Sequence, residues 1–184
     1  MRAAGELQGQ LAPHCQRVVS AGTIRRREAE VDELVLVVIP QFREEAPAES
    51  NQGALFAPPP DEDPATVTVN ALWAHLDWMV SGDAPRFRGT YRRGERWGDR
   101  HRQLWWEGYP VELYATTLES WGHILLLRTG PASFAQRYQA ALQRRRYETR
   151  SGQVFRYGRA VPLPDERDAF RLLDWTYRNP SDRE

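Results

Sequence analysis

The fold is decided by one stretch of the chain, residues 20–40, which reads SAGTIRRREAEVDELVLVVIP. Its second half, 31–39, is a nearly continuous run of β-branched residues and leucine that ends at Pro40. Such a run is typical of a strand that is buried on both faces. Gly22 ends an earlier strand that we predict over 17–21. Other elements must therefore cover both faces of the 31–39 strand.

Strand and helix patterns alternate along the rest of the chain. Helical spacing of apolar residues predicts helices over 3–12 and 69–80, with Asn70 as the cap of the second. The segment 41–66 is proline-rich and acidic, and we expect a long surface loop there. The further elements that we predict are strands over 85–91, 102–106 and 109–115, helices over 118–127 and 132–146, a strand pair around 147–157, and a helix over 165–173. This pattern indicates an α+β fold with a mostly helical end.

The composition excludes several classes of protein. All 25 basic residues are arginine, and the 184-residue chain contains no lysine. Enzymes that need a P-loop lysine, a Schiff-base lysine or a lysine-based lyase are therefore excluded. Cys15 is the only cysteine, so an internal disulfide and a four-cysteine zinc site are excluded too. No apolar segment approaches the roughly 18 residues that span a bilayer, and we expect a cytoplasmic protein with no membrane partner.

The formal charge sums to zero but is unevenly distributed. Residues 86–102 carry seven arginines against two acidic residues, whereas 44–63 is acidic. Arginine suits bidentate contacts with phosphate, so the basic segment is a candidate for binding a nucleic-acid backbone. The residues that we expect to make these contacts are Arg88, Arg92, Arg93 and Arg96. The alternative is that these arginines form only a solvated face.

The turn before the 31–39 strand has the chemistry of a phosphate site. The backbone at Gly22 can approach a ligand closely, and Thr23 can donate its hydroxyl. The guanidinium of Arg25 or Arg26 can form a fork of two hydrogen bonds to phosphate oxygens. Because a strand with carboxylates follows, the turn is a candidate for holding a triphosphate beside catalytic metal ions. The alternative is a tight turn with solvated arginines.

Four landmarks give the chain a resemblance to a known family. They are Gly22-Thr23 with Arg25-Arg26, the segment Val111-Glu112-Leu113, the stretch from Trp121-Gly122 to Thr129-Gly130, and the C-terminal stretch 168–184. In this order and at this spacing they resemble DNA polymerase family X, the polymerase β group of nucleotidyltransferases. The resemblance covers nearly the whole chain. It implies a palm over 1–118, with a mixed or antiparallel sheet and flanking helices, and a small, mostly helical thumb with a short β-hairpin over 119–184.

The resemblance also implies a set of site residues. They are Gly22, Thr23, Arg25 and Arg26 for the triphosphate, Thr129 and Gly130 for the nucleotide, and Glu33 and Glu112 as catalytic ligands of Mg²⁺ or Mn²⁺. Glu33 lies ten residues after Thr23, where the family has the first carboxylate of a pair. The second member of that pair is expected two residues further on, because alternate residues of a strand share a face. Val35 stands there in place of a carboxylate that would bridge two metal ions.

Two functions of different classes follow. The first is an enzyme that adds nucleotides from nucleoside triphosphates to a 3′ end of DNA by metal-dependent nucleotidyl transfer, with activity weakened by Val35. The second is a catalytically inactive module that binds nucleic acid or nucleotide, or that acts through a protein partner. Fold-level resemblance does not choose between them, since one fold can carry either function.

Overall fold

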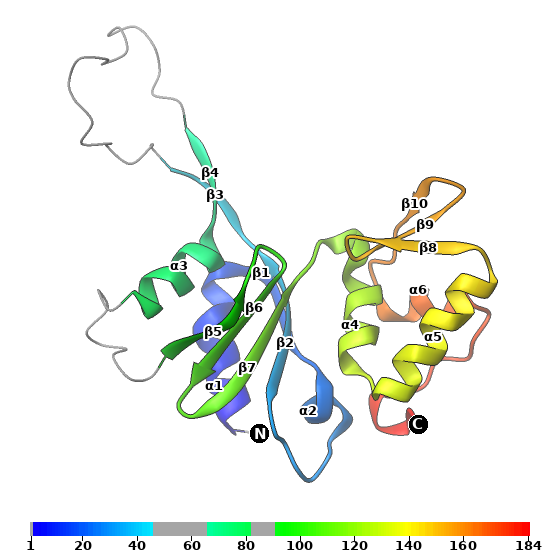
Figure 1. Ribbon diagram of the computed structural model, residues 1–184, viewed down its shortest axis with the longest axis horizontal. Helices are drawn as coiled ribbons and strands as arrows, with labels where there is room; N and C mark the ends of the chain where they lie inside the picture. Colours follow the sequence, from blue (N-terminus) through cyan, green and yellow to red (C-terminus); the bar gives the residue numbers. More distant parts are fainter. Residues whose placement is uncertain (1, 46–65, 82–90) are drawn as a thin grey trace, which may run out of the picture.

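The structure is a computed structural model that describes residues 2–45, 66–81 and 91–184 (Figure 1). Residues 85–90 of the strand predicted over 85–91 and most of the predicted 41–66 loop therefore lie outside the described residues. Tyr91 begins a strand that continues to Trp97, beyond the predicted end. The architecture is α+β, with a mixed sheet and flanking helices, as the sequence predicts. No helix in the described ranges is both long and apolar enough to cross a membrane.

The centre of the fold is a five-stranded sheet with the strand order β1-β2-β7-β6-β5. Its strands are β1 (Cys15–Ser20), β2 (Leu34–Pro40), β5 (Tyr91–Trp97), β6 (His101–Trp106) and β7 (Tyr109–Ala115). The pair β2–β7 is parallel and the other three pairs are antiparallel. Every residue of β2 is buried, as predicted, but the strand begins at Leu34, so residues 31–33 of the predicted 31–39 strand precede it, and Asp32 and Glu33 are exposed.

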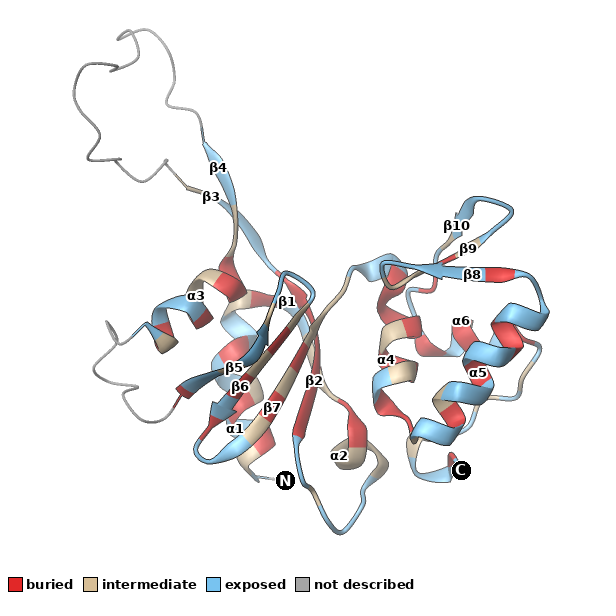
Figure 2. Ribbon diagram, in the orientation of Figure 1, coloured by how far each residue is buried: buried red, intermediate tan, exposed pale blue. Residues whose placement is uncertain are grey.

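The two faces of β2 pack against different partners (Figure 2). Alternate side chains that begin at Leu34 join a core with α1 (Arg2–Leu11) and α3 (Ala71–Val80). The intervening side chains, which begin at Val35, join a second core with Trp121 and Leu125 of α4 (Trp121–Thr129). Burial of each such side chain contributes roughly 1.5–3 kcal/mol, so both faces stabilise the strand.

The C-terminal region combines helices with a second sheet. It contains α4, α5 (Ala132–Arg144), α6 (Glu166–Arg171) and the antiparallel strands β8 (Tyr147–Arg150), β9 (Gln153–Arg156) and β10 (Arg159–Val161). The expectation of a single strand pair was wrong, because a second two-residue turn adds β10. Tyr157 and Gly158 both have positive φ, at 51° and 75°, as a tight hairpin turn between twisted strands requires.

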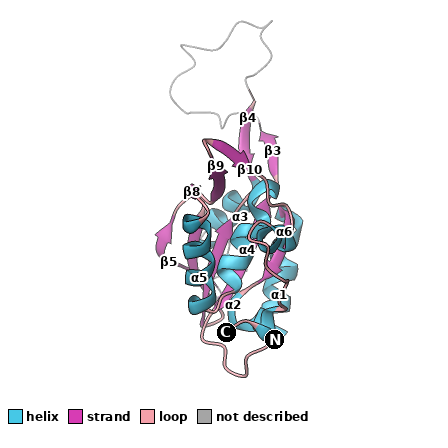
Figure 3. Ribbon diagram, turned by 90° about the vertical axis from the view of Figure 1, so that its right-hand side faces the viewer, coloured by secondary structure: helices cyan, strands magenta, loops and turns pink. Residues whose placement is uncertain are grey.

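Several smaller elements differ from the sequence prediction. The turn at 21–27 folds into the short helix α2 (Gly22–Arg26), and the hairpin β3 (Phe42–Glu45) with β4 (Val67–Asn70) flanks the undescribed segment. In the described ranges, 3-10 helices cover Ala12–His14, Leu118–Ser120 and Pro180–Asp182. The predicted caps are confirmed: Asn70 accepts from the Trp73 amide, and Asp165 forms a capping box at α6. Figure 3 shows β3, β4 and β8–β10 at the end of the molecule opposite both termini.

The C-terminal region depends on a close contact that requires a glycine. A Cβ added at Gly122 in α4 would lie 2.0 Å from the Asp165 carbonyl oxygen, and backbone on both sides prevents an easy adjustment. We expect Gly122→Ala to lower the free energy of unfolding by about 1–3 kcal/mol or more, measured by urea denaturation.

The matched control is Gly9→Ala in α1, where nothing lies within 4 Å of an added Cβ. Because alanine favours helix more than glycine does, this control should stabilise the protein by roughly 0.5–1 kcal/mol. Equal effects of the two substitutions would contradict the close packing of α4 on the start of α6.

Candidate functional site

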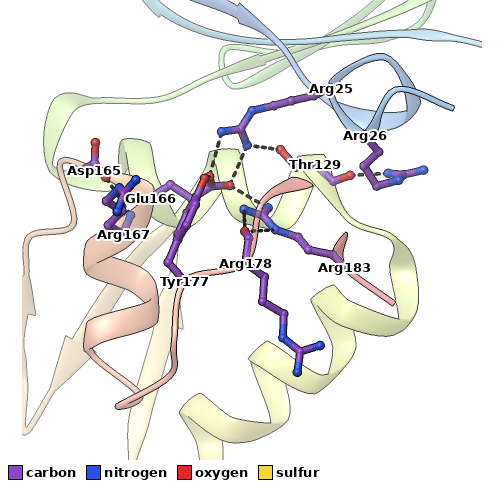
Figure 4. Close-up of polar contacts among 9 residues, drawn as sticks. All are labelled: Arg25, Arg26, Thr129, Asp165, Glu166, Arg167, Tyr177, Arg178 and Arg183. Carbon is purple, nitrogen blue, oxygen red and sulfur yellow. Dashed lines mark hydrogen bonds and ion pairs between the residues drawn. The ribbon is translucent and has the colours of Figure 1, made fainter. Parts of the chain in front are cut away.

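The arginines of the predicted phosphate turn contact the C-terminal region of the molecule. Helix α2 contacts α4 and the 3-10 helix Pro180–Asp182. From α2, the Arg25 guanidinium reaches Glu166 at the start of α6 and forms a fork, with Nη1–Oε1 at 2.7 Å and Nη2–Oε2 at 2.8 Å (Figure 4). Nη1 also donates to the Thr129 hydroxyl at 2.7 Å. The two N–H donors of Arg25 that could bind a phosphate thus bind the carboxylate of Glu166 instead.

Glu166 is 4% exposed and is surrounded by donors. Besides Arg25, it accepts from Arg183 Nη1 at 2.8 Å and from the Tyr177 hydroxyl at 3.3 Å. Arg183 is also 4% exposed, and it donates further to the Arg178 carbonyl at 3.1 and 3.2 Å. We call Arg25, Glu166 and Arg183 the buried triad.

The charge of Glu166 is stabilised by the two arginines. Burial alone would raise the pKa of Glu166, but the hydrogen bonds and charges of Arg25 and Arg183 lower it below the ordinary value. The stability that the ionised triad contributes is therefore present above the ordinary glutamate pKa. It is lost as the pH falls through the lowered value in the folded protein.

Arg26 is also occupied by contacts within the protein. Its Nη1 donates to the Thr129 carbonyl, and its Nε donates to Glu28 at 2.6 Å. Gly130 follows at the end of α4, and a Cβ added there would lie 3.1 Å from Arg26 Nη1. The structure thus brings together the predicted triphosphate residues Arg25 and Arg26 and the predicted nucleotide residues Thr129 and Gly130.

Gly22 and Thr23 lie against β2. Gly22 has φ +57°, and a Cβ added there would lie 3.1 Å from the Cγ2 atom of Val35. The preceding Ala21 amide donates to the Val35 carbonyl at 2.8 Å. The Thr23 hydroxyl is buried, and no described group hydrogen-bonds it. The glycine therefore allows the turn to pack closely on the strand.

Of the two predicted catalytic carboxylates, Glu112 lies within the sheet and Glu33 lies just before it. Glu112 in β7 pairs in register with Val35, and Glu33, two residues before Val35, precedes β2 and is accessible to solvent. Partial desolvation and then the charges of Glu112 and Asp32 raise the pKa of Glu33. Burial is thus the main cause of the raised pKa of Glu33, and the charge of Glu112 adds to it.

Glu112 is held by neighbours that the sequence did not single out. It accepts from His101 Nε2, from the Gln103 amide and, at 3.4 Å, from the Tyr114 hydroxyl. His101 and Gln103 face Tyr114 and Glu112 across the β6–β7 pair. Alternation along the 102–106 strand could have indicated this shared face, but only the register of the pairing identifies the contacts.

The residues present do not fit a two-metal centre. Such a centre needs three carboxylates that share two ions. Val35 is 6% exposed and packs with Trp121 and Leu125, so its position offers no ligand. Across residues 2–45, 66–81 and 91–184, no three His, Cys, Asp or Glu side chains are grouped so that they could hold a metal ion.

The predicted backbone-binding arginines lie on β5, except Arg88, which is outside the described residues. The Arg92 guanidinium lies over Trp105 at 5.0 Å, and that of Arg93 lies over Trp97 at 5.1 Å. Arg92, Arg93 and Arg96 are exposed, and none forms an ion pair with a described acidic residue. A groove of about 540 Å³ runs from Arg92 and Arg93 past Trp105 to Glu112. We call it the β5 groove.

Comparison of the chain with models of known protein families gives no match, and no curated protein matches its sequence. The likeness to DNA polymerase family X rests on the four sequence landmarks.

The buried triad should stabilise the contact between helix α2 and the C-terminal region. Glu166→Gln keeps the shape of the side chain but leaves the buried guanidinium of Arg183 and the partly buried guanidinium of Arg25 without a countercharge. We expect a loss of about 3–5 kcal/mol in the free energy of unfolding, measured by urea denaturation at pH 7.

The matched control is Glu148→Gln, which breaks an exposed pair with Arg150 in β8. Its cost should be about 1 kcal/mol or less, because solvent screens exposed pairs. A Glu166→Gln variant as stable as this control would show that the triad contributes no net stability.

Proposed function

We propose that the protein is a polymerase β-like palm-and-thumb module that binds DNA through the β5 groove and does not perform two-metal nucleotidyl transfer. In this proposal, residues 1–118 correspond to the palm and 119–184 to the thumb. The order of the four landmarks supports the family, and the mixed sheet with flanking helices is compatible with it.

One observation carries the proposal: two exposed arginines without an acidic partner among the described residues line the β5 groove, and one of them, Arg92, is stacked on Trp105 in the same groove. Stacking holds one face of each guanidinium and leaves the N–H groups at its edge free to donate to phosphate. A solvated surface arginine needs no such support. Phosphate contacts of this kind supply most of the affinity for a nucleic-acid backbone, whatever its sequence.

The residues around Val35 and Glu112 do not support two-metal catalysis. Val35 replaces the bridging carboxylate with an apolar side chain inside a core. The oxygens of Glu112 already accept hydrogen bonds from three side chains. A triphosphate would also compete with Glu166 for Arg25. The binding module is therefore the better-supported of the two functions.

The test is fluorescence anisotropy of the full chain with a labelled DNA duplex that has a recessed 3′ end. Removing Arg92 and Arg93 together, as Arg92→Ala/Arg93→Ala, should raise Kd by about tenfold or more. The slope of log K against log salt should fall by about 1.8, because two phosphate contacts are lost.

The control is the double variant Arg2→Ala/Arg159→Ala, which removes the same charge from exposed positions on α1 and β10. It should change Kd by less than about twofold, since only long-range charge is altered. If both double variants bind equally well, the β5 groove is not a DNA site.

A second candidate is metal-dependent addition of nucleotides at Glu33 and Glu112. It is favoured by the register of the sheet, in which Glu112 pairs with Val35, two residues after Glu33. One cation between the two would relieve their repulsion, and both carboxylates would supply oxygen ligands.

Incubation with Mg²⁺ or Mn²⁺, radiolabelled deoxynucleoside triphosphates and the recessed duplex separates the two functions. The binding module predicts no extended product with either metal. Extension by the unaltered protein that Glu112→Gln abolishes, with DNA affinity unchanged, would instead establish the enzyme.

A further inference from the structure

A second cavity lies at the carboxyl ends of the parallel strands β2 and β7. It has a volume of about 570 Å³ and is bounded by β3, the β5–β6 turn, α4 and the β8–β9 turn. The carboxyl ends of parallel strands are a common place for ligands. The volume is that of a ligand pocket, which typically measures roughly 300–1,000 Å³, and it suits one or two nucleotides better than a duplex.

The lining of this cavity is strongly basic. Arg96, Arg100 and Arg128 line it, against the single acidic residue Asp99. None of the three arginines forms an ion pair with a residue in the described ranges. Unpaired guanidinium groups around a concavity attract anions, and they match phosphate through paired N–H donors.

Arg128 is held in a fixed position by stacking. Its guanidinium carbon lies 3.8 Å from the centroid of the Tyr114 ring, and Tyr114 stacks on His101 with ring centroids 4.4 Å apart. The stack occupies the face of the guanidinium and leaves its edge for a ligand. His101, which lines the cavity, also contacts Glu112.

An exposed aromatic side chain also lines the cavity. Phe42 in β3 is 61% exposed although it is a large apolar residue. Aromatic faces beside arginines are the usual means of binding unpaired bases, because every base can stack. A patch of aliphatic side chains beside arginines would bind phosphate but would offer no ring on which a base can stack.

The opposite wall is fixed by the β8–β9 turn. Ser151 and Gly152 have φ of 52° and 82°, and a Cβ added at Gly152 would lie 3.2 Å from Ile124 Cδ1 in α4. The turn therefore rests closely on α4. The cavity is bounded on one side by the sheet region and on the other by the C-terminal region.

We propose that this cavity binds an unpaired nucleotide of a nucleic-acid strand, with its phosphate against Arg100 and Arg128 and its base on Phe42. The proposal rests on the proposed function for the kind of ligand, a nucleic acid. The new element is that a single-stranded segment of the nucleic acid binds in this cavity, next to the duplex that binds in the β5 groove.

The experiment is fluorescence anisotropy of the full chain with a labelled single strand of about 12 nucleotides and with a blunt duplex of the same length. Arg100→Ala/Arg128→Ala should raise Kd for the single strand by about tenfold and lower its salt slope by about 1.4, for two lost phosphate contacts. Phe42→Ala should raise the same Kd by about fivefold or more through lost stacking. Affinity for the duplex should stay within about twofold in both variants, because the duplex does not enter the cavity.

The control is again Arg2→Ala/Arg159→Ala, which should leave single-strand binding within about twofold. Equal weakening of single strand and duplex, or an effect no larger than in the control, would overturn the proposal. Displacement of the single strand by inorganic tripolyphosphate at equal phosphate concentration would also overturn it, in favour of a site for free polyphosphate.

The outcome for this cavity is separable from that for the β5 groove. Loss of duplex binding in Arg92→Ala/Arg93→Ala, with single-strand binding retained, would support both sites. If the β5 variant binds duplex normally while Arg100→Ala/Arg128→Ala loses the single strand, the cavity stands and the β5 groove does not.

Discussion

The rest of the structure depends on β2, a strand without a polar side chain that must lose water on both faces. Helices α1 and α3 cover one face, and α4 covers the other. Because α4 belongs to the C-terminal region, burial of β2 also fixes that region against the sheet. The same packing encloses Val35, and it leaves the edge strand β5 and its neighbour β6 with an open face on which the β5 groove forms.

The buried triad explains why arginines of similar appearance in the sequence have different roles. Arg25 and Arg183 share the carboxylate of Glu166, and taking one carboxylate out of water is tolerable only with such partners. Arginines on β5, on the β5–β6 turn and at the end of α4 have no acidic partner in the parts described. A net charge of zero therefore conceals paired arginines between the two regions and unpaired arginines along two concave surfaces.

Much of the fold could be predicted, because it follows from local pattern. The burial of β2 and the helix caps at Asn70 and Asp165 come from residue pattern or side-chain chemistry. The extent of β5 and the addition of β10 could not be predicted in this way. Both depend on pairing with a neighbouring strand, and a polar or arginine-rich segment carries little strand signal of its own.

The sequence by itself determined the α+β class, the buried central strand and the apolar residue at position 35, because each is a property of adjacent residues. Only the tertiary structure decided what the arginines contact. The fork between Arg25 and Glu166 joins residues 141 positions apart, and the stack of Arg128 on Tyr114 depends on how α4 crosses the sheet. No local pattern specifies such partners, because a guanidinium binds a phosphate, a carboxylate or an aromatic face through the same few atoms.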